Sequence, residues 1–416
     1  MVVFCGIDWA EGHHDIALVD QTGALIAKQR IEESVAGFAA LTEMLAAAGD
    51  SPECPVPVAI ETPRGLLVAA LLATGRPVYA INPMAVARYR ERISVARSKS
   101  DHADAMALAN ILRTDAHLHR QLPGDSDLAR SITVLARAHQ DAIWRRGSRT
   151  NELRSLLREY YPAFLNAFAG RRGVSPLATS DARALLAIAP TPAIGAKLSR
   201  TRIAAALRRG GRQRGITATT DQLHAALRTP HLRQPDLVEQ AMGRQALALL
   251  AALDTECRNV DELGLALTDA FSQHPDYAII TSFPGLGDHT GAKILAELGD
   301  DRTRFADARA VKAYAGSAPV TRASGRSLVV SHRRIKNNRL AATGFIWAFA
   351  SIAHNEPANT LYRRRRNHGD RHNAALRHLF NRMLGQLHHC LQTNQPYNPT
   401  NAWPTPPTQT PETLAA

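Results

Sequence analysis

The pattern of short apolar segments near the start of the chain is the feature that most constrains its fold. Residues 2–8 form a short apolar run, residues 14–20 follow after a turn at Gly12, and residues 24–30 follow after Gly23. Apolar runs of this length separated by glycine turns predict three strands of an antiparallel meander. The chain is therefore expected to begin with a β-sheet.

Helical and strand patterns alternate after this meander. Residues 36–48 carry apolar side chains at helical spacing, and the apolar segment at 65–73 predicts a second helix. Buried strands are predicted at 56–61 and at 77–81, and an Asn-Pro pair then opens a third helix. Three strands, helix, strand, helix, strand, helix is the element order of a ribonuclease H-like fold. The N-terminal domain is therefore predicted to be of the α/β class.

The remainder of the chain is predicted to be mostly helical. Residues 126–270 place apolar side chains at heptad-like spacing in two stripes, a pattern that fits packing within one chain and a coiled coil between two chains equally well. Residues 271–395 form a C-terminal domain that is helical apart from a strand-like patch near Leu328. Residues 396–416 are rich in Pro and Thr and are predicted to be a disordered tail. With an N-terminal domain at 1–125, we expect three domains and a tail.

Most of the positive charge lies in one stretch of sequence. The chain carries a formal net charge of +13, and residues 321–382 alone hold 13 Lys or Arg against 2 acidic residues, a net charge of +11. Cations that neutralise phosphates release condensed counterions, so a surface this basic favours binding to nucleic acid. A basic solubilising face is the alternative.

Two kinds of sequence pattern that the chain lacks bear on the location of the protein and on metal binding by its cysteines. No apolar stretch reaches about 18 residues, and the N-terminus lacks the pattern of a secretion signal. We therefore expect a soluble, cytoplasmic, nucleoid-associated protein without a membrane partner. The four cysteines have no paired spacing, which argues against a zinc ribbon and a disulfide framework.

Four carboxylates occur where predicted strands end or a helix begins. Asp8 ends the first strand and Glu61 ends the fourth, and these strands are neighbours in a ribonuclease H-like sheet. Asp101 and Asp104 lie three residues apart at the start of a helix and share one face. Closely packed carboxylates repel without a cation, and Mg²⁺ prefers oxygen ligands, so the set predicts a Mg²⁺ site. Taken singly, Asp101 and Asp104 also fit a helix cap and dipole compensation, and Glu61 also fits an ion pair with Arg64. Asp15 is interpreted as a surface or turn residue.

A glycine-rich segment matches a phosphate-binding pattern. Residues 281–295 read TSFPGLGDHTGAKIL, which is typical of a helix-hairpin-helix. Gly285 and Gly287 would let backbone N–H groups approach a phosphate, and Lys293 follows in the second helix as a further nucleic-acid contact. A plain glycine-rich turn between helices is the alternative.

A serine lies in a basic loop further along the chain. Ser324 is followed by Gly325, and a serine hydroxyl that attacks DNA needs a small neighbour and nearby cations. Ser317 in the same loop is the rival nucleophile, and either serine also fits an ordinary turn residue. The candidate cations are Arg322, Arg326, Arg333, Arg334 and Lys336.

Together, these motifs resemble the DEDD transposases of the insertion-sequence one-ten family, relatives of the Piv-type DNA invertases. The similarity lies in GID, IET, SKSDHADA, the glycine turn and YAGSAPVTRASG, within about residues 3–115 and 276–390. The resemblance implies a RuvC-like N-terminal domain, a coiled-coil middle and a C-terminal transposase domain. It implies Ser324 as the nucleophile, since Ser324 fits the Ser-Gly motif better than Ser317. The implied Mg²⁺ ligands are Asp8, Glu61, Asp101 and Asp104.

The resemblance also implies a reaction and its partners. Members of this family are similar in using a non-coding bridge RNA that pairs with donor and target DNA, and in exchanging strands through a transient serine–DNA linkage. The acidic pocket of one subunit meets the serine of another, which implies a homo-oligomer, either a dimer or a tetramer. Two alternatives stay open: a RuvC-like, structure-selective endonuclease that uses metal-activated water, and a nucleic-acid binder without catalysis.

Overall fold

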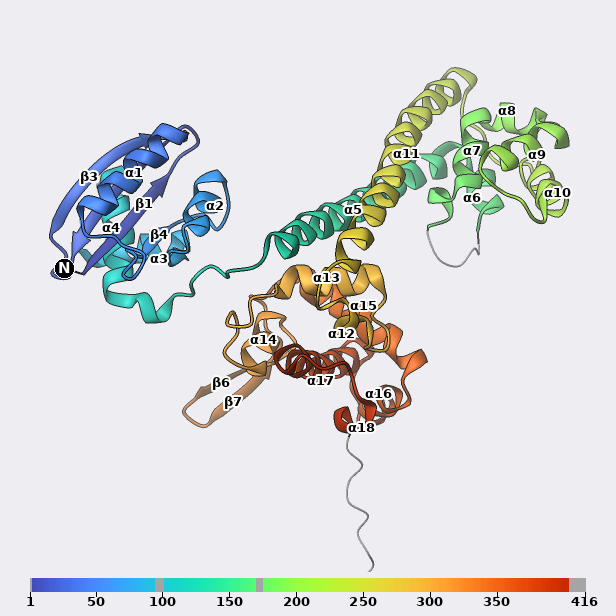
Figure 1. Ribbon diagram of the computed structural model, residues 1–416. Coiled ribbons are helices and arrows are strands. Elements are labelled where there is room, and N and C mark those ends of the chain that lie inside the picture. The colour runs from blue at the N-terminus through green and yellow to red at the C-terminus, as the bar shows by residue number, and fades with distance from the viewer. Residues whose placement is uncertain (1, 94–100, 170–174, 404–416) are drawn as a thin grey trace, which may run out of the picture. The chain divides into compact units, whose positions relative to one another are not determined.

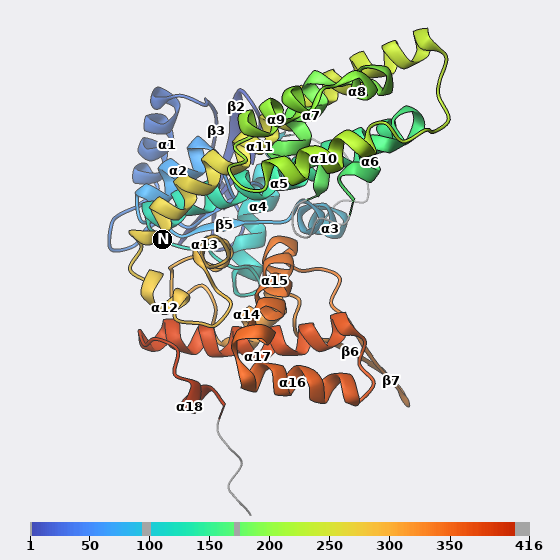
Figure 2. The ribbon, with the colours of Figure 1, turned by 90° about the vertical axis from the view of Figure 1, so that its right-hand side faces the viewer.

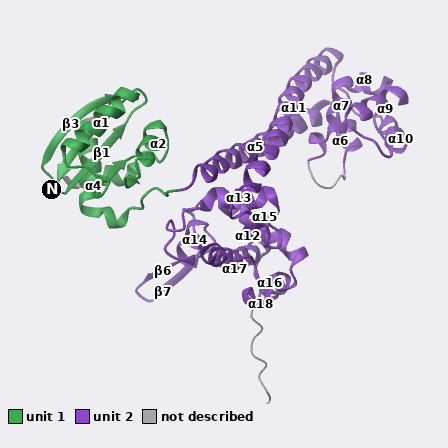
Figure 3. Ribbon diagram, in the orientation of Figure 1, with its two compact units in different colours: residues 1–124 green, residues 125–416 purple. Residues whose placement is uncertain are grey.

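The computed structural model describes residues 2–93, 101–169 and 175–403. The chain divides into two compact units, Met1–Gly124 and Asp125–Ala416 (Figures 1 and 3). The structure thus draws one boundary close to the end of the predicted N-terminal domain, and it joins the helical middle and the C-terminal region in a single unit.

The first unit is built on a mixed five-stranded sheet. Its strands are β1 (Val3–Trp9), β2 (His13–Asp20), β3 (Leu25–Glu32), β4 (Val58–Ile60) and β5 (Val78–Ala80), in the order β3-β2-β1-β4-β5. The first three strands pair antiparallel, and β4 and β5 continue the sheet in parallel with β1. The predicted meander and the predicted neighbourhood of the first and fourth strands are both confirmed.

Helices bury both faces of this sheet. The helices are α1 (Val35–Ala47), α2 (Leu66–Ala73), α3 (Pro83–Ile93), α4 (Asp101–Asp115) and the short η1 (Ala116–Leu118). Ile7 packs on one face with Leu41 of α1, whereas Ala59 packs with Leu108 of α4 in a second cluster. α4 approaches β1 so closely that a Cβ on Gly6 would lie 2.0 Å from the carbonyl oxygen of Ala105. Glycine at this position therefore determines how near α4 comes to the ends of the strands.

Two long helices, α5 (Asp127–Tyr160) and α11 (Asp236–Ser272), pack against each other in the second unit (Figure 1). Ile132 of α5 and Leu267 of α11 belong to the apolar core of the C-terminal region, whereas Leu153 and Leu253 belong to a separate helical core. The two apolar stripes therefore pack within one chain. The separate core is completed by α6 (Pro162–Ala167), η2 (Pro176–Ala178), α7 (Ser180–Ile188), α8 (Pro192–Lys197), α9 (Arg200–Arg209) and α10 (Ile216–Ala226).

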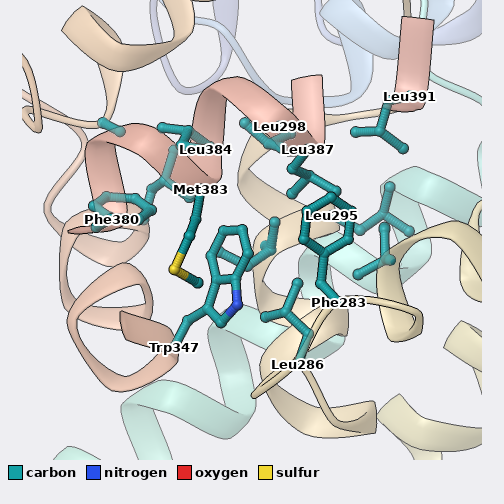
Figure 4. Close-up of a cluster of buried hydrophobic side chains, with 14 of the residues drawn as sticks. Phe283, Leu286, Leu295, Leu298, Trp347, Phe380, Met383, Leu384, Leu387 and Leu391 are labelled. Carbon is teal, nitrogen blue, oxygen red and sulfur yellow. The ribbon is translucent and has the colours of Figure 1, made fainter. Parts of the chain in front are cut away.

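The C-terminal region consists of helices of different lengths, of which α17 (His372–Thr393) is the longest (Figure 2). They enclose a core rich in aromatic side chains. Figure 4 shows Trp347 between Phe283 and Phe380, and the ring centroids of these residues lie 5.7 and 6.2 Å from that of Trp347. The elements are α12 (Tyr277–Thr281), α13 (Asp288–Leu298), α14 (Ala308–Tyr314), β6 (Val320–Ser324), β7 (Ser327–Ser331), α15 (Asn338–His354), α16 (Glu356–Asn367), α17 (His372–Thr393) and α18 (Pro399–Ala402).

The structure corrects two sequence-based expectations in this region. Ser324 was expected in a loop, but it ends strand β6 of a β-hairpin, because the residues on either side of its turn pair in register. The start of the predicted disordered tail is ordered: Tyr397 and Trp403 pack on the core, and the indole Nε1 of Trp403 donates to Tyr397 Oη at 2.8 Å. Residues 404–416 of the predicted tail lie outside the described residues.

No helix in the described ranges combines the length and the apolar character needed to cross a membrane.

Candidate functional site

An acidic pocket lies where β1 and β4 of the first unit end. Its volume is about 490 Å³, and three of the predicted Mg²⁺ ligands, Asp8, Glu61 and Asp104, line it. The other lining residues are Trp9, Ala10, His13, Asp15, Pro83 and Arg90. Carboxylates that are far apart in the sequence therefore meet at one place, and we call this place the acidic pocket.

The register of the strands explains this convergence. Asp8 of β1 lies directly opposite Asp15 of β2, and β4 runs parallel to β1 so that Glu61 follows at the level of Asp8. Side chains alternate along a strand, so Asp8 shares a face of the sheet with Gly6. α4 packs on this face against Gly6 and brings Asp104 to the pocket.

Basic side chains contact the buried carboxylates around the pocket. Nη1 of Arg90, from α3, donates to Oδ1 of Asp104 at 2.5 Å, and Asp104 is only 4% exposed. Asp15 lies 2.7 Å from Nη2 of Arg30 and 3.0 Å from Nδ1 of His102. Since removing one partner of a buried ion pair leaves an uncompensated charge, these contacts hold the carboxylates in place.

The donor atoms of the acidic pocket suit Mg²⁺. Carboxylate oxygens are the ligands that this hard cation prefers, and the pocket presents them from β1, α4 and the end of β4. Within the described residues, no three His, Cys, Asp or Glu side chains are arranged to hold a metal ion. Asp104 faces Arg90, and the side chain of Asp101, the first residue of α4, lies outside the described residues. The Mg²⁺ site therefore rests on donor chemistry and stays a prediction.

Sequence reasoning missed two residues of the pocket. Asp15 was interpreted as a surface residue; this is wrong, because Asp15 is 1% exposed and shares its face with Asp8. Pairing the two first strands around the Gly12 turn would have placed Asp15 opposite Asp8. No sequence pattern pointed to Arg90, because its partner Asp104 comes from a different helix.

Ser324 lies at the tip of an exposed hairpin. It pairs with Ser327 across the turn, and Gly325 and Arg326 form the two turn residues. Gly325 has φ of +55°, a left-handed conformation that glycine adopts without a Cβ clash. Arg322 lies two residues before Ser324 and so projects from the same face of the hairpin. The serine is thus open to an external substrate and close to cationic side chains. We call Val320–Ser331 the serine hairpin.

Ser317, the rival nucleophile, lies in a different environment. It is 4% exposed, and its Oγ lies 3.0 Å from Oδ1 of Asn381 and 3.3 Å from the carbonyl oxygen of Lys312. A hydroxyl that is enclosed and already hydrogen-bonded is poorly placed to attack a phosphate from outside. Accessibility therefore favours Ser324.

The two glycines of the predicted phosphate-binding turn have different roles. Gly285 has φ of +83°, and a Cβ there would lie 2.7 Å from Oγ of Ser351 and 3.1 Å from the carbonyl oxygen of Trp347, both on α15. Packing within the domain therefore already requires glycine at this position. Gly287 is exposed at the N-cap of α13, and no atom lies within 4 Å of its Cβ position. The Gly287 end of the turn is the end that a ligand can approach.

The predicted basic contacts differ in exposure. Lys293 is half-buried, its Nζ donates to Oε1 of Gln140 at 2.9 Å, and burial lowers its pKa to about 8. Arg322, Arg326 and Arg334 are exposed. The remaining two, Arg333 and Lys336, are half-buried and line a second, smaller pocket.

Comparison with known protein families defines the class of this protein. A family model described as "Transposase" matches residues 5–162, the part that contains all four predicted carboxylates. The chain is a transposase, an enzyme class that acts on DNA. A second model, described as "Transposase IS116/IS110/IS902 family", matches residues 277–363, which include the glycine turn and the serine hairpin. The chain belongs to this family, and the resemblance inferred from its motifs is confirmed.

Similarity to individual proteins extends over almost the whole chain. The chain is 57% identical over 403 residues to the "Mini-circle putative transposase for IS117" of Streptomyces coelicolor, covering 97% of each chain. It is 28% identical over 403 residues to an uncharacterized 42 kDa protein of insertion element IS900 from Mycobacterium paratuberculosis, covering 95% of this chain and 97% of that protein. Both alignments include residues 163–276, which lie between the two family models.

Proposed function

We propose that this transposase cleaves and rejoins donor and target DNA through a transient covalent bond between Ser324 and a DNA phosphate. The observation that carries the proposal is the position of Ser324 at the exposed tip of the serine hairpin, with Arg322 on the same face and Arg326 in the turn. The enclosure of Ser317 supports the same assignment.

The domain architecture supports the expected parts of such an enzyme. The strand order β3-β2-β1-β4-β5 is the order of a ribonuclease H-like sheet, which favours a RuvC-like N-terminal domain. The succession of α12, a glycine turn and α13 favours a helix-hairpin-helix that grips phosphates at its Gly287 end. The long pair α5 and α11 supports a coiled-coil region built within the chain.

Strand cleavage and rejoining through Ser324 need no reagent other than DNA and water. Oγ of Ser324 bonds to phosphorus while the bond from phosphorus to one sugar oxygen breaks. The serine proton passes to solvent, and the departing sugar oxygen takes a proton from solvent. A strand-end hydroxyl then attacks the serine-linked phosphate. The new bond from oxygen to phosphorus forms as the bond from phosphorus to Oγ of Ser324 breaks, the hydroxyl proton passes to solvent, and Oγ takes a proton back. Arg322 and Arg326 stabilise the negative charge that develops on the phosphate oxygens.

The acidic pocket has a complementary task in this proposal. Asp8, Glu61, Asp101 and Asp104 would hold Mg²⁺ and so position the phosphodiester. When bound, the ion supplies charge neutralisation at the reacting phosphate. Binding of the ion requires the carboxylates to be ionised.

Target choice and assembly complete the proposal. A non-coding bridge RNA would select donor and target sequences by base pairing, and the net charge of +11 within residues 321–382 supports a large nucleic-acid surface. The acidic pocket of one subunit would serve the serine of another in a homo-oligomer.

The test is a search for the covalent intermediate. Purified protein is incubated with Mg²⁺, the RNA that flanks the element, and labelled donor and target DNA, and denaturing gels reveal DNA shifted by attached protein. We expect an adduct that Ser324→Ala abolishes and Asp8→Ala weakens. Ser327→Ala is the matched control, because Ser327 faces Ser324 across the same turn, and we expect it to keep the adduct.

A different outcome would identify a different enzyme. If DNA is cut without an adduct and Ser324→Ala cuts equally well, the serine has no chemical role. The acidic pocket would then act as a RuvC-like endonuclease with metal-activated water, for which the convergence of Asp8, Glu61 and Asp104 is the supporting observation.

A further inference from the structure

A second pocket, of about 330 Å³, lies at the base of the serine hairpin, between the end of α14, the segment after β7, and helices α15 and α17. Its volume falls within the range of about 300–1,000 Å³ that is typical of small-molecule sites. The lining residues are Ala315, Gly316, Ser317, His332, Arg333, Lys336, Ala341, Phe345, Asn373, Ala374, Arg377 and Phe380. We call it the basic–aromatic pocket.

The walls of this pocket combine an apolar interior with cationic groups. Phe345 of α15 and Phe380 of α17 supply aromatic rings, and Phe380 also belongs to the buried core seen in Figure 4. Arg333, Lys336 and Arg377 supply positive charge, and Asp and Glu are missing from the lining that the described residues form. Such a site suits a ligand with a flat apolar part and an anionic part.

One donor in the pocket wall lacks a partner. Nε of Arg333 is shielded from solvent, and within the described part of the chain it has no hydrogen-bond acceptor. A buried donor without an acceptor is costly, and a guanidinium is the side chain best matched to a phosphate. Lys336 is a second cation beside this donor, and its Nζ donates to the carbonyl oxygen of Arg333 at 3.5 Å. Within the described residues, the guanidinium of Arg333 therefore keeps unused hydrogen-bonding capacity beside the pocket.

An exposed aromatic surface continues from the pocket. Phe349 lies one helical turn after Phe345 on α15 and is 62% exposed. Its ring lies 6.3 Å from that of His372, which precedes the pocket residue Asn373 on α17. His372 in turn accepts or donates a hydrogen bond with Oη of Tyr362 at 2.8 Å. The ring of His372 stands edge-on to those of Phe349 and Tyr362, at 85° and 83°, so the exposed Phe349 is the ring on which an unpaired base can stack.

We infer that the basic–aromatic pocket binds one unpaired nucleotide of single-stranded DNA, with the base against Phe345 and the phosphate on Arg333, Lys336 and Arg377. The neighbouring base stacks on Phe349. DNA is the polymer on which this enzyme class acts, and a base must leave its partner in the duplex to place its ring in a pocket. The inference rests on the proposed function and deepens it, because it assigns the holding of an unpaired base to particular residues at the base of the serine hairpin. Binding to the pocket does not depend on serine chemistry.

The test measures binding by the full-length chain in EDTA, so that no cleavage takes place. Fluorescence anisotropy gives the affinity for three labelled DNAs: a perfect duplex, the same duplex with one unpaired thymine, and the single strand. Wild type is expected to prefer both DNAs that carry an unpaired base. Arg333→Gln is expected to lower affinity for those two by roughly tenfold while the affinity for the perfect duplex changes much less.

Two matched variants separate the pocket from the general basic surface. Arg334→Gln removes the same charge from an exposed neighbour outside the pocket lining and is expected to weaken all three DNAs alike. Ile346→Ala removes an exposed apolar side chain beside Phe345 and is the control for Phe349→Ala, which should reduce single-strand binding. Ala341→Phe, which fills the pocket, should abolish the preference for an unpaired base. If that variant does not fold, the comparison of Arg333→Gln with Arg334→Gln tests the inference.

Two results would overturn the inference. In one, Arg333→Gln and Arg334→Gln weaken all three DNAs equally, which leaves only a basic surface. In the other, an RNA strand of the same sequence shows the dependence on Arg333 and Phe349 whereas DNA does not. Failure of the serine proposal is a separate result, since it removes the covalent adduct but leaves the preference for an unpaired base intact.

Discussion

The acidic pocket of the first unit and the serine hairpin of the second unit differ in what holds their functional groups in place. Asp104 is 4% exposed, bound by Arg90, and carried by a helix that packs tightly on Gly6. The hairpin residues 321–330 are all exposed, and Leu328 is 68% exposed. Isolated two-stranded hairpins are only marginally stable in water. The carboxylates are therefore preorganised by tertiary packing, whereas the serine is presented by local structure alone.

This difference indicates how the two groups can work together. A rigid pocket can position a phosphate, and an element with few tertiary contacts can adapt its position to reach it. The predictions that follow challenge or refine this contrast, beginning with the largest expected effect.

The largest effect is expected when either functional group is removed, and mixing tests whether they act between subunits. Ser324→Ala and Asp8→Asn should each lower strand exchange on the order of 10³-fold, as expected for groups that act directly on the reacting phosphate. A mixture of the two variants should recover activity, because one subunit supplies an intact pocket and another an intact serine. The double variant mixed with either single variant is the control and should stay inactive. A mixture as inactive as its components would show that both groups act within one subunit.

The next effect tests the tight packing behind the acidic pocket. Gly6→Ala places a methyl group 2.0 Å from the carbonyl oxygen of Ala105, so the helix must move. We expect a loss of about 3 kcal/mol in the free energy of unfolding of the first unit, the upper part of the range for overpacking. Gly12→Ala is the matched control, since no atom lies within 4 Å of its Cβ position. Equal midpoints for the two variants in thermal unfolding would contradict close packing of α4 on β1.

A smaller, local effect is expected in the serine hairpin. Gly325→Ala forces a residue with a Cβ into φ of +55°, at a cost of roughly 1–2 kcal/mol. Because the hairpin has few tertiary contacts, this cost should appear as faster amide exchange in β6 and β7 and as reduced strand exchange. The midpoint of thermal unfolding should not change. A lower midpoint would show that the hairpin contributes to the core of the unit, and would weaken the contrast with Gly6.

The smallest effect is expected in how the free energy of unfolding of the second unit depends on pH. Burial, with help from the charge of Lys293, lowers the pKa of His139 to about 4, and the ring of His139 lies 5.4 Å from that of His289. An imidazole in the unfolded chain titrates near 6.5, so the unfolded state binds more protons between pH 6.5 and 4. The free energy of unfolding should therefore decrease as the pH falls through this window. Chemical unfolding of His139→Gln should show a shallower decrease; an unchanged slope would remove His139 as its cause.

Much of the first unit could be predicted because its signals are local. Glycine turns and apolar runs predicted the meander, and the Asn-Pro pair predicted the start of α3, where Asn82 Oδ1 accepts from the Met84 amide at 2.8 Å. The neighbourhood of β1 and β4 followed from the element order. By contrast, the interpretation of Asp15 as a surface residue was wrong, because nothing in the sequence around it shows that α4 covers its face of the sheet.

The second unit was less predictable for the same reason. Its apolar stripes fitted packing within and between chains equally well, and only the observed contact between α5 and α11 distinguishes them. The Ser-Gly pair indicated a flexible loop, whereas the pairing of Ser324 with Ser327 makes it a hairpin tip. The composition near residue 396 indicated disorder, yet the rings of Tyr397 and Trp403 find partners on the core.

By itself, the sequence determined the order of the elements, the concentration of positive charge and the carboxylate and Ser-Gly motifs that place the chain among transposases. These are properties of neighbouring residues and of composition. Tertiary structure alone decided that Arg90 neutralises Asp104, that Ser317 is enclosed while Ser324 is exposed, and that Arg333 faces a pocket with aromatic walls. Each of these depends on packing between segments distant in sequence, and burial of one side chain by a distant segment leaves no local pattern.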